Sequence, residues 1–319
     1  MESIGTWWMW AAFAGVVMVM LAVDLFVVGG GRQHRVSFRE AAVWSVVWVG
    51  VSLAFASALW LYLDGAQGRE IANARTLEYL TGYVIEKSLA IDNVFVWLML
   101  FGFFGIPLEL QKRVLVLGVL GAIVMRTAMI FAGAWLITQF HWMLYLFGAF
   151  LLITGIKMWL TAGKAPDMDK NPVLRWITGH VPLINRYHGD ALWIGQGKRR
   201  RYTPLFVVLV MIAVTDVIFA VDSIPAIFAI TSDPFIVLTS NVFAVLGLRA
   251  MFFLLAGMAD RFHLLPYGLA LVLAFIGSKM LLIDAFKIPV LVSLGVVVAI
   301  LAVTVVASML SPAKAHAKS

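Results

Sequence analysis

The chain has 319 residues, of which 62% are hydrophobic and only 13% are charged, and its mean hydropathy is +0.96. A soluble domain carries about 25% charged residues, so this chain has too few polar side chains to cover itself in water. It contains no cysteine, which excludes disulfides, thiolate metal ligands and thiol redox chemistry. The composition therefore predicts an integral membrane protein.

Apolar segments long enough to span a bilayer occur nine times along the chain, since one span takes about 20 residues. The first has no basic region before it and no small-residue cleavage site after it, so we expect a retained helix and not a signal peptide. We predict an all-α polytopic protein whose single transmembrane domain covers residues 1–310. The predicted spans are 6–28, 41–63, 78–104, 113–138, 142–162, 204–231, 234–258, 265–285 and 288–310.

Lys and Arg residues predict the orientation of these spans. With the N-terminus outside, the cytoplasmic segments hold sixteen of the 24 Lys and Arg residues, including the run Lys198–Arg201. Cytoplasmic loops of membrane proteins are enriched in these residues, so the net charge of +7 indicates topology and not nucleic-acid binding. We expect a cytoplasmic tail at 311–319 and a basic cytoplasmic loop at 163–203. This loop would contact anionic lipid or, as the alternative, a specific partner.

Ten charged residues lie within the predicted spans and more than two residues from either span end, where each isolated charge costs about 2.5–3.5 kcal/mol. Pairing or burial between helices has to offset that cost. The six histidines lie in loops or at helix ends, so a metal site within the membrane would use oxygen ligands, with a methionine sulfur as a conceivable addition. No methionine is assigned as a ligand. The charged residues are Asp24, Glu86, Lys87, Asp92, Arg126, Lys157, Asp216, Asp222, Arg249 and Lys279.

The polar residues recur in the same order in two parts of the chain, at offsets of 130, 123 and 122 residues. Each unit contains three spans, so the second copy would insert upside down relative to the first. Such inverted repeats are common in secondary transporters, where the substrate site lies at the repeat interface. We predict repeat A at about 78–162 and repeat B at about 204–285. The matched pairs are Glu86 with Asp216, Asp92 with Asp222, Asn93 with Ser223, Arg126 with Arg249 and Lys157 with Lys279.

The spacing within each repeat predicts how the acids are arranged. Residues six apart on a helix differ by about 9 Å in height and about 120° in direction, while residues seven apart nearly superpose. Two tiers of carboxylates follow, with Glu86 and Asp222 in the outer half of the membrane and Asp92 and Asp216 nearer its centre.

A proline adds a further ligand to this prediction. Pro225 lacks an N–H, so it is expected to leave the carbonyl of Val221 without its helical hydrogen bond, beside Asp222. Carboxylate, amide, hydroxyl and carbonyl oxygens form a hard ligand set, which suits Mn²⁺, Mg²⁺ or Ca²⁺ better than Zn²⁺ or Cu⁺. The candidate metal ligands are Asp24, Glu86, Asp92, Asn93, Asp216, Asp222 and Ser223.

Structural explanations compete with each of these roles. The four acids of the repeats are also explained if their only role is to form static ion pairs with the buried arginines and lysines. Asp24 lies near the inner end of the first span and is equally well explained as an interfacial residue. Asn93 and Ser223 are explained equally well as metal ligands or as residues that only form hydrogen bonds to neighbouring helices.

Four segments of the chain match the pattern of a known family. They are Val23–Phe26, Val36–Ser45, Glu86–Val96 and Asp216–Ala226. Together they resemble the TerC family, in particular its Alx-type bacterial inner-membrane members, from about residue 10 to 305. The resemblance implies manganese export, an association with tellurite resistance and a relation to the LysE-type transporters. It also implies that membrane acids bind the metal. The family's acidic and polar positions fall on Asp24, Glu86, Asp92, Asn93, Asp216, Asp222 and Ser223.

The leading hypothesis is a secondary transporter that exports Mn²⁺ across the bacterial inner membrane, without a tightly bound cofactor. Its expected partners are the cation and the lipid bilayer, and no nucleic acid. No Walker motif indicates ATP as the energy source. The alternatives are a membrane scaffold that assists metal loading of secreted proteins, and an exporter of another small cation or an amino acid. An enzyme is not expected, because the spans contain no histidine motif and no nucleophile–base pair.

Overall fold

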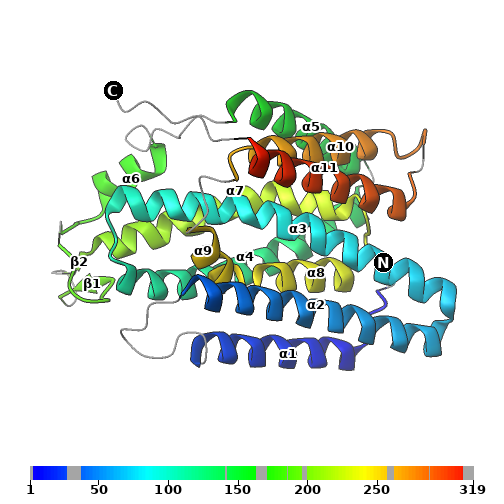
Figure 1. Ribbon diagram of the computed structural model, residues 1–319, viewed down its shortest axis with the longest axis horizontal. Helices are drawn as coiled ribbons and strands as arrows, with labels where there is room; N and C mark the ends of the chain where they lie inside the picture. Colours follow the sequence, from blue (N-terminus) through cyan, green and yellow to red (C-terminus); the bar gives the residue numbers. More distant parts are fainter. Residues whose placement is uncertain are drawn as a thin grey trace.

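The computed structural model describes residues 3–26, 37–140, 142–162, 171–184, 186–195, 200–256, 262–286 and 288–311. They form a bundle of long helices that run side by side, with one small hairpin at one end (Figure 1). The elements are α1 (Trp7–Phe26), α2 (Phe38–Gln67), α3 (Arg69–Phe104), α4 (Leu108–Gln139), α5 (Met143–Thr161), α6 (Pro172–His180), β1 (Trp193–Ile194), β2 (Arg201–Tyr202), α7 (Pro204–Phe228), α8 (Pro234–Val245), α9 (Leu248–Ala256), α10 (Leu265–Leu281) and α11 (Val290–Leu310).

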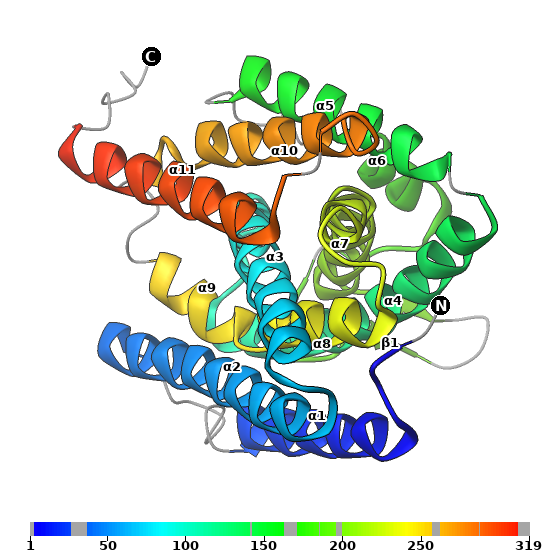
Figure 2. The same ribbon diagram turned by 90° about the vertical axis from the view of Figure 1, so that its right-hand side faces the viewer.

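Seven segments of the described chain are helical, long and apolar enough to cross a membrane, and α10 is a shorter apolar helix. The charge-rich helix α3 runs through the middle of the bundle beside α7 (Figure 2). Eight of the nine predicted spans fall on the seven segments and α10, with the span predicted at 234–258 divided between α8 and α9. The ninth, at 78–104, falls on α3, which is not among the seven because its charged residues lower its hydropathy. The chain is therefore an all-α polytopic membrane protein, as predicted.

Helices α2 and α3 extend beyond their predicted apolar spans at one end of the bundle. α2 continues to Gln67, and α3 begins at Arg69 directly after Gly68, whose φ of 93° lies in the region that favours glycine. The intervening sequence is too polar to be detected as a membrane span. Its three Ala and two Arg residues are of types that favour helix, so both helices continue past the apolar region.

The span formed by α8 and α9 is interrupted at Gly247, whose φ is 87°. A Cβ atom there would lie 2.6 Å from Trp48 of α2, so the bend is packed closely against that ring. Lys87 Nζ of α3 donates a hydrogen bond to the Ala244 carbonyl at 3.1 Å, in the last turn of α8. A cation at a helix C-terminus is favourable because it faces the negative end of the helix dipole.

Glycines bring α5 and α10 into very close contact. A Cβ on Gly155 would lie 2.8 Å from the backbone of Ala270, and one on Gly277 would lie 2.6 Å from the backbone nitrogen of Leu152. Small residues at helix interfaces allow such an approach, on which association within a membrane depends. The pair α5–α10 lies on the far side of α3 and α7 from α1 and α2 (Figure 2).

The described part of the basic loop packs at the end of the bundle where α3 ends and α4 begins (Figure 1). Arg113 Nη1 of α4 lies 2.9 Å from Asp190 Oδ2, and the Tyr187 hydroxyl donates to the Phe104 carbonyl at 2.6 Å. Burial raises the pKa of the Tyr187 hydroxyl. These contacts attach the loop to α3 and α4. The tail at 312–319 and parts of the loop lie outside the described residues.

Candidate functional site

The centre of the bundle holds an ion-paired cluster around Arg126 of α4. Arg126 Nη1 contacts Glu86 Oε1 of α3, and Arg126 Nη2 lies 3.2 Å from Asp216 Oδ1 of α7. The three side chains are at most 3% exposed. An unpaired charge at such depth costs several kcal/mol. One guanidinium shared between two carboxylates therefore allows both acids to remain in the membrane interior.

Neutral polar groups complete this cluster. Asn93 Nδ2 donates to Asp216 Oδ1 at 3.1 Å. Arg126 Nη1 donates to Ser223 Oγ at 3.2 Å and to Asn241 Oδ1 of α8 at 3.5 Å. The five side chains Glu86, Asn93, Arg126, Asp216 and Ser223 thus meet at one place, from helices far apart in the sequence.

Three oxygen atoms of the cluster are buried and have no hydrogen-bond partner among the described residues. They are Glu86 Oε2, Asn93 Oδ1 and Asp216 Oδ2. A buried polar atom without a partner costs about 1–3 kcal/mol, and native proteins rarely leave one without a partner, a water or an ion. These oxygens are acceptors that a bound cation or a water molecule would satisfy.

A small cavity of about 30 Å³ adjoins the cluster between α3 and α7. One water molecule takes up about 30 Å³ in the liquid, so the cavity accommodates one small species and not a fully hydrated cation. Val221, whose carbonyl was predicted to be a ligand, is not among the described residues that line it, and α7 continues unbroken through Pro225 to Phe228. The lining residues are Leu89, Asp92, Asn93, Arg126, Met158, Phe219, Asp222, Ser223 and Leu273.

Asp92 and Asp222 face this cavity and make no contact with Arg126. Asp92 forms no hydrogen bond or ion pair with any residue in the part of the chain that the structure describes. Asp222 lies near Thr154 and Lys157, both on α5. Two carboxylates and one lysine leave formal negative charge beside the cavity.

Comparison with known proteins shows which family the chain belongs to. The model of the family described as "Integral membrane protein TerC family" matches residues 71–316. The chain belongs to the TerC family. This confirms the resemblance seen in the sequence.

Relatives of this TerC protein match over nearly its whole length. Proteins named "Putative membrane-bound redox modulator Alx" are 56% identical in Salmonella typhi and 55% identical in Escherichia coli (strain K12). The alignments cover 96% and 95% of this chain, and 95% of each relative. An uncharacterized membrane protein of Myxococcus xanthus is 42% identical over 97% of this chain and 94% of its own length. No solved structure gives a significant match.

Asp24 lies in a second ion pair, away from the cavity. Arg249 Nε of α9 lies 3.3 Å from Asp24 Oδ2 of α1, and Arg249 Nη2 donates to the backbone carbonyl of Asp24. The structure therefore does not bring Asp24 together with the other candidate ligands. Arg249 is also not placed like Arg126, its predicted repeat counterpart.

The described residues contain no group of three or more Asp, Glu or His side chains that could hold a metal ion. The acids of this TerC protein are instead divided between the Arg126 cluster and the cavity.

Three residues near this site were not singled out from the sequence. Asn241 is fully buried, and an amide in an otherwise apolar span is costly enough to have indicated a polar contact. Thr154 is one helical turn from Lys157, but hydroxyl groups are common in membrane helices and give little signal. Met158 gave none, because methionine is apolar and frequent in such helices.

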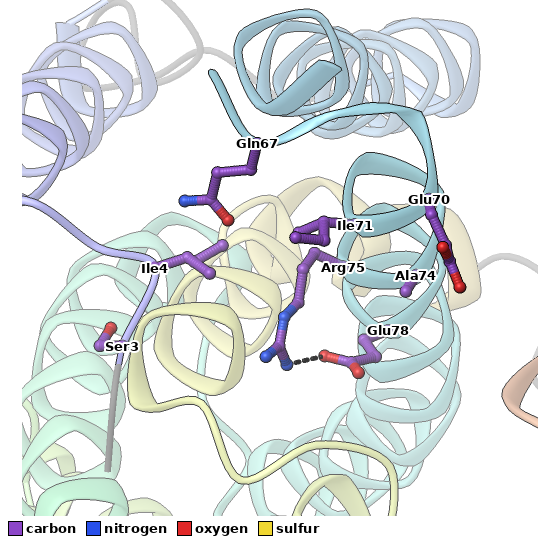
Figure 3. Close-up of a pocket in the computed structure, with 8 residues that line it drawn as sticks. All are labelled: Ser3, Ile4, Gln67, Glu70, Ile71, Ala74, Arg75 and Glu78. Atoms are coloured by element: carbon purple, nitrogen blue, oxygen red, sulfur yellow. Dashed lines mark hydrogen bonds and ion pairs between the residues drawn. The ribbon is translucent and has the colours of Figure 1, made fainter. Parts of the chain in front are cut away.

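A larger hollow of about 540 Å³ lies at the end of the bundle where α2 meets α3. Figure 3 shows Arg75 and Glu78 pointing toward one another in it, with Arg75 Nη1 3.0 Å from Glu78 Oε2. Glu70 points away from this pair and is exposed. The charged groups of the hollow are paired or solvated, so the hollow lacks the unpartnered buried oxygens of the central cluster.

Proposed function

We propose that this protein is a secondary transporter of the bacterial inner membrane that exports a divalent cation, with Mn²⁺ as the cargo. The observation that carries the proposal is the set of buried oxygens without partners, beside a cavity faced by two carboxylates that Arg126 does not neutralise. A divalent cation would satisfy these oxygens and the formal negative charge together. A neutral or anionic cargo would satisfy the oxygens only in part, or not at all.

The ligands in this proposal are Asp92, Asn93, Asp222 and Ser223, which line the cavity. They supply carboxylate, amide and hydroxyl oxygens, a donor set suited to Mn²⁺ and other hard divalent cations. Glu86 and Asp216 each use one oxygen for Arg126 and retain the other. These two acids can therefore contribute to the cation without giving up their ion pairs.

The size of the cavity favours a small inorganic cargo. A volume of about 30 Å³ admits a cation that has shed most of its water, and it is too small for an amino acid or an organic cation. The alternative of organic-cation export would require a much wider conformation. This favours the metal over the other cargoes considered.

Contacts between the predicted repeats support an inverted two-fold arrangement around the site. Asn93 bonds to Asp216, and Ser223 interacts with Glu86. This second contact pairs the repeat counterparts of the first two residues. The counterpart positions of α5 and α10 are paired in the same way, because Gly148 meets Gly277 while Gly155 meets Ala270. We propose that the site lies on the pseudo-two-fold axis, as in transporters that alternate between two openings.

One end of the pathway is closed in this conformation. Between the hollow beside Glu78 and the buried Glu86, α3 passes α8 at Gly82, where a Cβ atom would lie 2.9 Å from Ser240 Oγ. We propose that the hollow of Figure 3 is the external vestibule. Release of the cation would then require α3 and α8 to separate at this contact.

The energy source in this proposal is an ion gradient or the membrane potential. The chain has no Walker motif, and a carboxylate freed of its cation can accept a proton. The name of the Alx relatives describes a redox modulator, but this sequence contains no cysteine for thiol chemistry. Transport of a redox-active metal would change the redox state of a compartment without a redox group in the carrier.

Flux measurements test the proposal. Purified protein in liposomes should move Mn²⁺, and Asp92→Asn and Asp222→Asn should each lower the rate at least about tenfold, because each removes one anionic ligand. Asp190→Asn is the matched control, because it removes a carboxylate that pairs with Arg113 outside the cavity. Wild-type protein that moves no Mn²⁺ would refute the transporter and favour the scaffold. Asn variants with wild-type flux would refute the carboxylate site.

A further inference from the structure

One thioether lies among the oxygen groups of the cavity. Met158 of α5 lines it together with Asp92 and Asp222 from the two central helices. The residue before it, Lys157, lies near Asp222, so this turn of α5 faces the candidate ligands. The remaining apolar lining consists of Leu89, Phe219 and Leu273, none of which has an atom that can donate electrons to a metal.

The repeat counterpart of Met158 is also a methionine, but its surroundings differ. Met280 of α10 stands 122 positions later and is 1% exposed. It packs against Gly148 in the α5–α10 interface and is not among the described residues that line the cavity. Two equivalent methionines thus have different surroundings, and only one adjoins the carboxylates.

Thioether sulfur distinguishes between cations that carboxylates bind alike. Mg²⁺ and Ca²⁺ use oxygen ligands only, whereas softer ions such as Cd²⁺ accept thioether ligands. Mn²⁺ also prefers oxygen, but as a transition-metal ion it tolerates a sulfur ligand better than Mg²⁺ and Ca²⁺ do. Mg²⁺ also gives up its water reluctantly, and a cavity of about 30 Å³ leaves little room for retained water. Ca²⁺ takes six to eight ligands, all of them oxygen atoms, so a sulfur atom takes no part in binding it.

We infer that Met158 determines the selectivity of this site, by favouring Mn²⁺ and softer divalent ions over Mg²⁺ and Ca²⁺. The inference rests on the proposed function and specifies which cations the site accepts. Asp92 and Asp222 supply the charge, and the sulfur of Met158 supplies a ligand that Mg²⁺ and Ca²⁺ do not use. Substitution at Met158 changes the ratio of the affinities for soft and hard cations. It has a smaller effect on the affinity that the carboxylates provide for all divalent cations.

Competition in proteoliposomes tests this role. The probes are Mn²⁺ as the transported ion and Cd²⁺, Mg²⁺ and Ca²⁺ as competitors. Met158→Leu keeps the size of the side chain and removes the sulfur. It should raise the Cd²⁺ concentration for half-inhibition, relative to that of Mg²⁺, on the order of tenfold. Met158→Cys retains a sulfur atom and should keep the preference for Cd²⁺. Met280→Leu, the matched control at the repeat counterpart, should leave the ratio unchanged.

The outcomes separate this inference from the transporter proposal. If the wild type moves Mn²⁺ and Met158→Leu shows the wild-type ratio of Cd²⁺ to Mg²⁺ inhibition, the inference is overturned and the transporter stands. If the wild type moves no Mn²⁺, the proposed function fails first. If Met158→Leu does not transport, the ratio is measured instead by equilibrium binding of Cd²⁺ and Mg²⁺ to the purified variant. An equal loss of Cd²⁺ preference in Met158→Cys would also overturn the inference, because it would show that sulfur is not the cause.

Discussion

At the scale of single residues, Arg126 is the group on which the buried centre depends. Its guanidinium contacts Glu86 and Asp216, and neither acid has another cationic partner among the described residues. Removing one member of a buried ion pair is strongly destabilising because the other charge remains without compensation. Removing the Arg126 side chain would leave two carboxylates buried without a compensating positive charge.

We therefore expect Arg126→Gln to lower the free energy of unfolding by about 3–5 kcal/mol, measured as a lower melting temperature of the purified protein in detergent. Combining it with Glu86→Gln and Asp216→Asn should recover much of the loss, since the remaining groups are neutral and can share hydrogen bonds. A single variant as stable as the wild type would show that the pairs of Arg126 contribute little. A triple variant no more stable than the single one would show that charge is not the cause.

Residue chemistry and helical spacing predict which charged residues meet in this centre. The cost of charge in a membrane singled out Glu86, Asp216 and Arg126, and the repeat placed their helices together. The exclusion of Asp24 could not be foreseen, because whether Arg249 turns toward α1 depends on the bend at Gly247. Met158 could not be foreseen either, because only packing distinguishes it from Met280.

At the scale of elements, the α5–α10 pair depends on the absence of side chains. Cβ atoms on Gly155 or Gly277 would meet the backbone of the opposite helix, which cannot move aside as a flexible side chain can. Overpacked contacts of this kind cost about 1–3 kcal/mol. The contact joins the two predicted repeats, so its loss would separate α5 and Met158 from the cavity.

Alanine substitutions test this contact. Gly155→Ala and Gly277→Ala should each lower the free energy of unfolding by about 1–3 kcal/mol. Gly121→Ala in α4 is the control, because nothing lies within 4 Å of its Cβ position, and it should be neutral or stabilising by up to about 1 kcal/mol through helix propensity. Equal melting temperatures for the three variants would contradict the close contact.

The sequence predicts one continuous span at 234–258, whereas the structure has a break between α8 and α9. An isolated glycine in an apolar span does not by itself indicate such a bend. Two features of Gly247, its φ of 87° and the nearness of Trp48, now predict the effect of a side chain. Gly247→Ala should destabilise the protein by about 1–3 kcal/mol or more. Gly68→Ala isolates the first feature, since Gly68 has a φ of 93° and open space around it. If the two variants lose equal stability, the contact with Trp48 contributes nothing.

At the scale of the whole molecule, α1 begins and α11 ends at opposite ends of the bundle (Figure 1). α6 and the hairpin lie at the end toward which α11 runs, and the hollow between α2 and α3 lies at the other. The basic residues of the loop predict that its end faces the cytoplasm. Export in the proposed direction would then carry the cation from the loop end toward the hollow.

The orientation can be measured without background, because the chain has no cysteine. Gln67→Cys places a single thiol at the exposed end of α2, and Gly179→Cys places one on the exposed surface of α6. A membrane-impermeant maleimide should label Gln67→Cys in intact spheroplasts and Gly179→Cys only after permeabilisation. Labelling of both after permeabilisation shows that both thiols are accessible. The reverse pattern would place the basic loop outside, against the charge distribution, and would turn the proposed export into uptake.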